Sequence, residues 1–493
     1  MKKTLSIFAV IGLLATGCTD FLELRTEGTM PTSGTDYSKA EAIFQSVSAA
    51  YASLRLSEGD AYAYVSVLDI PSDDADKGST STDGAATAGE LDAFTYGPTN
   101  TLINQMWTKF YDIASAANHA LQELPEFEKN MNTEENKLYC RQCAGEAKVI
   151  RAYAYFNLLR MFGSVPIVEG SMTAEELASN PAKTEAELYT FIYKDLDEAI
   201  AVLPESYSKS YAGRFTVYTA RALKSKVALY KKDWTEAASQ ADVIIRSKKF
   251  SLVPNFRDVF SMDYENSVES LMEIQASSLG QSSGDAPLCY YAFIQGPRNN
   301  QPSNMQGWGF KVPSQNLYDF LNARGDNDRI AATFLVSGTV TPEGDEILAS
   351  CANKWYNGKV YTPSAYNKWS YNGYGFDYNM RIIRYAEILL IYAEASVQQA
   401  YPAGLIGAQA ALDLVRDRAG LAPVAATLDN IYDERRAELA LEENRFFDLV
   451  RTGKASAVLG ALGYKSGKNE HFPIPDAQRK LNTTLPESTG YSY

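Results

Sequence analysis

The hydrophobic pattern along the chain is that of α-helices over most of its length. Within 37–55, Ile43, Val47, Ala50 and Leu54 recur every three or four positions and fall on one helical face. The same period predicts helices over 102–124, 134–163, 185–204, 216–247, 380–400, 408–420 and 428–453, whereas 469–482 has an extended pattern. We therefore expect a mostly α fold.

Two stretches interrupt the helical period. Residues 71–101 contain Gly, Ser, Asp and Pro throughout and predict a long loop. From about 250 to 380 the period weakens, and Gly, Asn, Ser and Tyr dominate, as in "NKWSYNGYGFDYNM". Long loops inside a compact domain are usually functional or disordered. We therefore expect these insertions to be functional or disordered.

The N-terminus has the pattern of an export signal. Lys2 and Lys3 precede an apolar run that is too short to span a membrane, and small residues precede Cys18. We expect a signal peptide over 1–17, lipidation of Cys18 and a polar tether over 18–40. An ordinary signal peptide with an incidental cysteine is the alternative. We then expect an N-terminal helical half over 41–260, and a C-terminal half over 261–493 that is loop-rich first and helical afterwards.

The chain is acidic, with a formal net charge of −14 at pH 7. Such a field repels nucleic-acid phosphates and anionic lipid headgroups. We therefore expect no nucleic-acid partner, and contact with a membrane only through the lipid on Cys18. Aromatic residues make up 12% of the chain and include 32 tyrosines, many of them in the polar insertions.

Four cysteines remain after Cys18. Cys140 and Cys143 form a CxxC pair, which is the spacing of half a zinc site, but the chain has no second CxxC and only two histidines. We interpret the pair as two residues of a helix and expect no metal centre. A disulfide between Cys289 and Cys351 would suit an exported protein, although the sequence leaves the pairing of all four open.

The hairpin over 216–247 resembles a tetratricopeptide repeat. Small residues lie on two helices that meet at Lys232–Asp233, with Lys232 at the position where the repeat has glycine. In addition, "RYAEILLIYAEA", "ALDLVRDRAGL", "IYDERRAELALEENRFFDLVRTG" and "HFPIPDAQRKLN" occur in the order of the C-terminal half of the RagB/SusD family. The strings "AKVIRAYAYFNLLRMFGSVPIV" and "GWGFKVPSQNLYDFLNARGDNDRI" resemble the N-terminal half and the middle of that family.

The resemblance covers nearly the whole chain and implies a fold, a location and a function. The implied fold is a single compact SusD-like bundle of tetratricopeptide-like hairpins with long irregular insertions that carry the ligand site. The implied location is the outer membrane of a Gram-negative bacterium, with the lipid-anchored protein facing outward, and Asp20 and Glu23 are similar to the family's export signal. Such proteins capture oligosaccharides and deliver them to a SusC-like TonB-dependent transporter.

Sugars are bound by aromatic rings stacked on their C–H faces and by planar polar groups at their edges. Tyrosine and tryptophan suit this task because they combine a large contact area with a polar handle. The insertions supply the ligand-binding candidates Tyr96, Asn100, Tyr291, Arg298, Asn304, Trp308, Trp369, Tyr371 and Tyr374. For any one ring the alternative is packing within a loop or contact with the transporter. Trp107 and Trp234 lie on helical periods, and we assign them to the core.

Asp73, Asp74 and Asp76 could offer oxygen ligands to a structural calcium ion. Their stretch, however, lacks the alternating pattern of an EF-hand loop. A solvated loop or a helix cap is the alternative, and we expect no other cofactor.

The Arg- and Glu-rich segment 430–451 contains acids that resemble a catalytic pair, such as Glu438 with Glu442 or Glu443. Glycoside hydrolysis needs one carboxyl group with a raised pKa, whereas neighbouring arginines lower carboxyl pKa values. We therefore interpret the segment as ion pairs and predict a non-catalytic protein. A secreted α-helical glycosidase or polysaccharide lyase, and a protein-only helical-repeat scaffold, are the alternatives. The sequence does not specify the glycan, and a peptide ligand stays open.

Overall fold

The computed structural model describes residues 35–276, 290–300, 306–366, 377–402 and 404–493. Helices dominate this part of the chain, and its few strands form two-stranded ribbons. The mostly α fold class is therefore confirmed.

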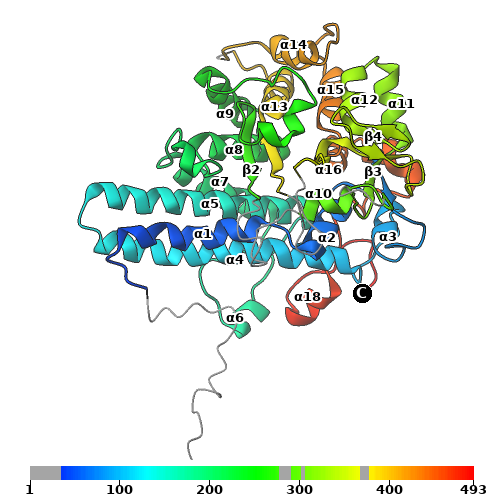
Figure 1. Cartoon of the computed structure of the whole chain (residues 1–493). Coiled ribbons are helices and arrows are strands. Elements are labelled where there is room, and N and C mark those ends of the chain that lie inside the picture. The colour runs from blue at the N-terminus through cyan, green and yellow to red at the C-terminus, as the bar shows by residue number, and fades with distance from the viewer. Residues whose placement is uncertain (1–34, 277–289, 301–305, 367–376, 403) are drawn as a thin grey trace, which may run out of the picture.

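Two long helices and a shorter one form the base of the molecule. Helices α1 (Ile43–Leu54), α4 (Thr101–Asn130) and α5 (Glu134–Phe162) lie side by side in the lower half of the view (Figure 1). The Thr133 side chain accepts a hydrogen bond from the backbone N–H of Asn136 and caps α5. Met106 and Phe110 of α4 are almost fully buried, and each contributes about 1.5–3 kcal/mol of hydrophobic stabilisation.

Helical hairpins continue above this base. Helices α7 (Glu185–Ile200), α8 (Val217–Lys231) and α9 (Trp234–Ser247) follow one another, and α7 packs on α5. Small residues let α8 and α9 approach closely enough for the Ser225 hydroxyl to donate to the Ala237 carbonyl at 2.8 Å. Lys232 ends α8 in the left-handed region at φ 62°, which is the conformation that favours glycine. The hairpins have the predicted tetratricopeptide-like form.

The C-terminal helices show where periodicity misled. Residues 380–400 were expected to be one helix, but Met380–Arg384 form β8, which pairs with β2 (Ser270–Ile274) before α13 (Tyr385–Gln398) begins. The segment 428–453 divides into α15 (Leu428–Leu439) and α16 (Arg445–Arg451), because Leu441 and Glu443 adopt positive φ. The tail is not wholly extended, since Asp476–Leu481 form α18. Between these elements lie α14 (Ala408–Arg418) and α17 (Ala455–Leu459).

The insertions contain short elements rather than bare loop. The stretch 71–101 includes β1 (Ala75–Gly78) and α3 (Ala88–Asp92), which follow α2 (Glu58–Leu68). The middle of the chain adds α10 (Tyr290–Gln295), β3 (Phe310–Pro313), α11 (Gln315–Ala323), α12 (Asn327–Thr333), β4 (Phe334–Val336), β5 (Thr339–Val340), β6 (Glu346–Ile347) and β7 (Trp355–Asn357), and α6 (Ala174–Ala178) lies beside the base. Because β1 pairs with β3, segments far apart in the sequence meet at the loop-rich end of the molecule (Figure 1).

The cysteines and two tryptophans lie where helical periodicity puts them. Cys140 and Cys143 are buried free thiols within α5, as the interpretation of the CxxC pair required. Trp107 is 5% exposed and belongs to the core, and Trp234 packs against it. Cys351 is a free thiol, and Cys289 lies outside the described residues.

Candidate functional site

The candidate site is built on the ribbon of β1 and β3. Gly78 ends β1 at φ 71°, and Gly309 precedes β3 at φ 73°. A Cβ atom on Gly78 would overlap the Gly309 carbonyl, so glycine is required at this approach. The Ser79 N–H donates to the Gly309 carbonyl at 2.6 Å and closes the ribbon. The loop that follows β1 is thereby held against the loop that precedes β3.

A cluster of aromatic side chains packs beside this ribbon. Trp308 is half-buried, and its ring meets Tyr62 of α2 and Phe293 of α10 edge-on, with centroids 6.2 and 6.0 Å apart. Tyr62 also packs on Phe310, with centroids 4.6 Å apart. The Tyr62 hydroxyl and the Thr87 hydroxyl are hydrogen-bonded at 3.1 Å. We call the half-buried pair Trp308 and Tyr62 the tryptophan platform.

A charged pair borders the platform. Arg298 Nη2 lies 3.2 Å from Asp83 Oδ2, and both side chains are 32% exposed. Asp83 also accepts a hydrogen bond from the Ser79 hydroxyl at 2.8 Å. The bond from Ser79 is the largest cause that lowers the pKa of Asp83, and Arg298 adds to it. The pair therefore presents a carboxylate and a guanidinium group, which are planar hydrogen-bonding groups, beside the rings.

The loop after β1 is fixed by an internal cation. The Lys77 ammonium donates to the carbonyls of Gly78, Thr80 and Asp83 at 3.0, 2.8 and 2.8 Å. It also lies 5.7 Å from the centroid of Phe310. Three hydrogen bonds from one lysine restrict the backbone of this loop, so the Asp83 side chain faces Arg298 in one geometry.

Close backbone contact fixes Trp308 from the other side. The Trp308 N–H donates to the Phe293 carbonyl at 3.2 Å, and the Gly307 N–H donates to the Pro297 carbonyl at 2.9 Å. A Cβ atom on Gly307 would lie 2.5 Å from Cα of Gly296. This contact needs glycine, and it places the ring on the end of α10.

Tyr291 does not line an open site, which corrects the prediction. Its side chain is 5% exposed, and its hydroxyl donates to Glu443 at 2.6 Å. The buried ammonium of Lys311 contacts Glu443 at 2.8 Å, Asp69 at 3.0 Å and the Tyr291 hydroxyl at 3.1 Å. Burial raises the pKa of Asp69 to about 6, against the opposing effect of Lys311. This charged cluster ties β3 to α10 and to the turn before α16.

Tyr96 and Asn100 are also buried rather than presented to a ligand. Tyr96 is 1% exposed, and its hydroxyl accepts a hydrogen bond from Asn469 at 3.1 Å. Asn100 caps α4 through its side-chain oxygen, and its amide donates to Glu90 at 2.8 Å and to the Thr87 carbonyl at 3.1 Å. Both expectations were wrong because partners distant in sequence cover these side chains. Asn100 nevertheless helps to place Thr87, which contacts Tyr62.

The structure thus brings together two of the predicted site residues, Arg298 and Trp308. Asn304, Trp369, Tyr371, Tyr374 and Cys18 lie outside the described residues. Sequence reasoning missed Tyr62, Lys77 and Asp83. Tyr62 lies on α2, a helix that the hydrophobic pattern did not predict. Lys77 and Asp83 stood in the long polar loop, where the run of Ser, Thr and Asp was the available signal.

The acids considered for calcium are compensated by arginines. Asp73 accepts two hydrogen bonds from Arg445 at 2.7 and 2.9 Å, and Asp74 accepts one from Arg436 at 2.7 Å. A calcium ion between these two carboxylates would have to displace both guanidinium groups. Asp76 lies on β1 and is exposed. No group of three or more metal-ligating side chains occurs within the described ranges.

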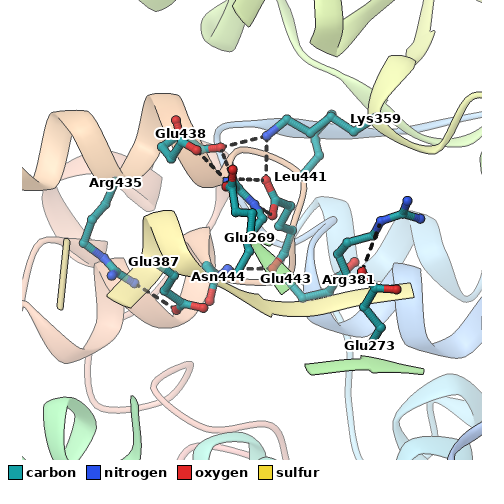
Figure 2. Close-up of polar contacts among 12 residues, drawn as sticks. Glu269, Glu273, Lys359, Arg381, Glu387, Arg435, Glu438, Leu441, Glu443 and Asn444 are labelled. Carbon is teal, nitrogen blue, oxygen red and sulfur yellow. Dashed lines mark hydrogen bonds and ion pairs between the residues drawn. The ribbon is translucent and has the colours of Figure 1, made fainter. Parts of the chain in front are cut away.

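The acids of the segment 430–451 lie in a buried lattice of ion pairs. Glu438 is fully buried and contacts Arg384 at 2.6 Å, Arg329 at 2.8 Å and Arg418. In Figure 2 the Lys359 ammonium donates to the backbone carbonyl of Glu438 at 2.9 Å. The same figure shows the Arg435 side chain directed toward Glu387. Burial raises the pKa of Glu438, but the guanidinium groups outweigh that effect and hold it well below its usual range. A carboxyl group that stays ionised is no general acid.

Comparisons with known proteins agree with this architecture. Residues 338–491 match the family model described as "SusD family", and residues 20–229 match the one described as "Starch-binding associating with outer membrane". The chain belongs to the SusD/RagB family. A SusD-like protein, P2, from Formosa agariphila is 27% identical over 530 residues, which cover 100% of both chains.

Solved SusD-like structures have the same fold. A structure titled laminarin binding SusD-like protein is 28% identical with a TM-score of 0.78, over 92% of this chain and 99% of its own. Surface glycan-binding protein A from Bacteroides fluxus is 26% identical with a TM-score of 0.76, over 92% of this chain and 100% of its own. These SusD-like neighbours are binding proteins rather than enzymes, in agreement with the prediction of a non-catalytic protein. Among the described residues, no helix is both long and apolar enough to cross a membrane.

Proposed function

We propose that this SusD-like protein is a glycan-binding lipoprotein of the outer cell surface. It captures oligosaccharides without cleaving them and delivers them to a SusC-like TonB-dependent transporter. The observation that carries the proposal is the tryptophan platform with the Arg298–Asp83 pair at its edge. The names of its relatives support the same class of ligand.

The platform has the chemistry that a sugar requires. The face of a pyranose ring is made of C–H groups, which gain dispersion and hydrophobic contact on an aromatic ring. Its rim of hydroxyl groups both donates and accepts, and it needs planar polar partners such as Arg298 and Asp83. Trp308 is fixed by the Gly307–Gly296 contact, so little conformational entropy is lost on binding.

The location follows from the N-terminal pattern and the family. Lipidation of Cys18 would anchor an acidic protein that has no electrostatic attraction to lipid headgroups. Asp20 and Glu23 direct it to the outer face. A protein that binds glycans but does not cleave them needs a partner that takes up the bound glycan, and a transporter fills this role.

A binding panel tests the ligand class. The lipid-free protein beginning at Thr19 is run through native gels that contain laminarin, starch, xylan or mannan, and the incubated glycans are analysed for shorter products. Retardation in at least one gel with no cleavage is the expected result. Cleavage would establish the glycosidase or lyase alternative. No retardation in any gel would contradict the proposal and favour the protein-only scaffold.

Anchoring and partnership are tested in the cell. Wild-type protein and Cys18→Ser are expressed with a C-terminal tag, and lipidation is followed by incorporation of labelled palmitate. We expect label, surface protease sensitivity and co-purification of a TonB-dependent barrel for the wild type only. Release of unlabelled wild-type protein into the medium would contradict the anchor. An anchored protein that co-purifies no barrel would contradict the transporter partnership.

A further inference from the structure

A cavity lies apart from the tryptophan platform. It has a volume of about 230 Å³ and shares no residue with the platform. Two 3₁₀ turns, η5 (Asp258–Phe260) and η6 (Met262–Tyr264), form one wall, and residues of 358–366 form the opposite wall. The two walls are far apart in sequence but in contact, since the Tyr366 hydroxyl of one wall donates to Asp263 of the other at 2.6 Å.

Three tyrosines surround this cavity. Tyr264 and Tyr366 are 38% and 41% exposed, and Tyr361 is half-buried. The Tyr361 hydroxyl donates to Asp345 at 2.5 Å. Hydrogen bonds at the hydroxyls of Tyr361 and Tyr366 hold these two rings in place. Rings fixed in this way contribute contact area at a low cost in side-chain entropy.

The charges of the cavity select against an anionic occupant. Arg257 donates two hydrogen bonds to Glu343, at 2.5 and 2.8 Å, and both side chains are 32% exposed. The carboxylates of Asp258 and Asp263 add two further negative charges to the lining. Among the described residues the lining has one cation, Arg257, and it is already paired with Glu343, so these residues repel phosphates and carboxylates. A neutral, hydroxylated ligand meets both the ring faces and these planar polar groups without that penalty.

We infer that the cavity is a second carbohydrate subsite, which binds a neutral sugar unit of the same glycan class as the platform. This inference rests on the proposed function, because the occupant is assigned as carbohydrate. Two separated contacts on one polysaccharide chain raise the overall affinity through effective concentration. A short oligosaccharide that occupies the platform alone gains nothing from the second contact.

The double variant Tyr264→Ala/Tyr366→Ala tests the subsite. Both rings are well exposed, so the fold should be retained, and circular dichroism with thermal melting checks it. The matched control is Tyr211→Ala, whose ring is 51% exposed on η4 (Lys209–Tyr211), outside the cavity and the platform. The probe is whichever of laminarin, starch, xylan or mannan retards the wild type, together with a hexasaccharide cut from it.

We expect the double variant to bind the polysaccharide about tenfold more weakly than the control, with hexasaccharide affinity within about twofold of wild type. Hydrogen exchange should slow at 257–264 and 358–366 when the polysaccharide binds. Polysaccharide affinity equal to that of the control would overturn the subsite while leaving the proposed function intact. Failure of the wild type to bind any of the four polysaccharides would overturn both.

Discussion

The substitution Glu438→Gln tests whether the buried lattice stabilises the fold. Glu438 lies at the end of α15 with its side chain fully buried against Arg329, Arg384 and Arg418. Glutamine keeps the volume and one acceptor oxygen but removes the charge, and its amide directs N–H groups at guanidinium groups. Removing one partner of a buried ion pair costs about 3–5 kcal/mol, because the remaining charges stay buried without compensation.

That cost can be converted into a melting temperature. The lipid-free protein that begins at Thr19 has roughly 475 residues and an unfolding entropy of about 1 kcal/mol per kelvin, since each residue contributes about 2.1 cal/mol/K. A single cooperative transition would then shift downward by about 3–5 °C. The pKa of Glu438 lies well below its unfolded value, so its stabilisation is present above about pH 4.5 and is lost as the pH falls through the folded pKa. The difference between variant and wild type should therefore be full at pH 7 and shrink in acid.

Differential scanning calorimetry at pH 7 and at pH 4 or below measures both effects. The control is Asp429→Asn on the same helix, where an 83% exposed carboxylate pairs with Lys454. We expect this control to change stability by no more than about 0.5 kcal/mol. A Glu438→Gln shift as small as that of the control, or one that grows in acid, would refute the reasoning.

Three further predictions concern other buried groups. Burial raises the pKa of Glu265 to about 7, so ionisation of its carboxyl group costs stability as the pH rises from about 4.5 to 7. Glu265→Gln should therefore be more stable than wild type by up to ~3 kcal/mol at pH 8 but not at pH 4. Urea unfolding at each pH measures this difference. Gly307→Ala should overlap the Phe293 carbonyl and displace the platform, weakening glycan binding at least tenfold in titrations; unchanged affinity would argue against the contact. Burial raises the pKa values of Cys140 and Cys143 to about 11 and about 12, so mass spectrometry should find neither alkylated at pH 8 until urea is added.

Local pattern was sufficient for the helical hairpins but not for every helix. The hairpin 216–247 could be predicted because its small residues and its turn lie within one short segment. The ion-pair interpretation of the acids near Glu438 rested on arginines within 430–451. Glu438 is ion-paired, but its partners Arg329, Arg384 and Arg418 all lie outside that segment. The break between α15 and α16 was missed because it depends on a distant residue. The Leu441 carbonyl accepts a hydrogen bond from Lys311, which no periodicity reveals.

The candidate site was only partly predictable for the same reason. Tyr96 and Tyr291 stand in loop-like sequence, yet Asn469 and Glu443 bind their hydroxyls from far along the chain and bury them. Tyr62 lies on α2, which the hydrophobic pattern did not predict, and the pairing of β1 with β3 brings Trp308 against it. Composition can identify aromatic residues suited to sugars. Which of them face a ligand depends on long-range pairing.

The measurement that tests the central claim most directly is isothermal titration of the lipid-free protein with the hexasaccharide of the glycan that retards it. Wild type, Trp308→Ala and the exposed-ring control Tyr211→Ala are compared at one pH and salt concentration. Loss of a central aromatic contact should cost about 2 kcal/mol, so Trp308→Ala should bind about thirtyfold more weakly than wild type and the control should bind equally well. Equal affinity of Trp308→Ala and wild type would contradict the platform as the glycan site.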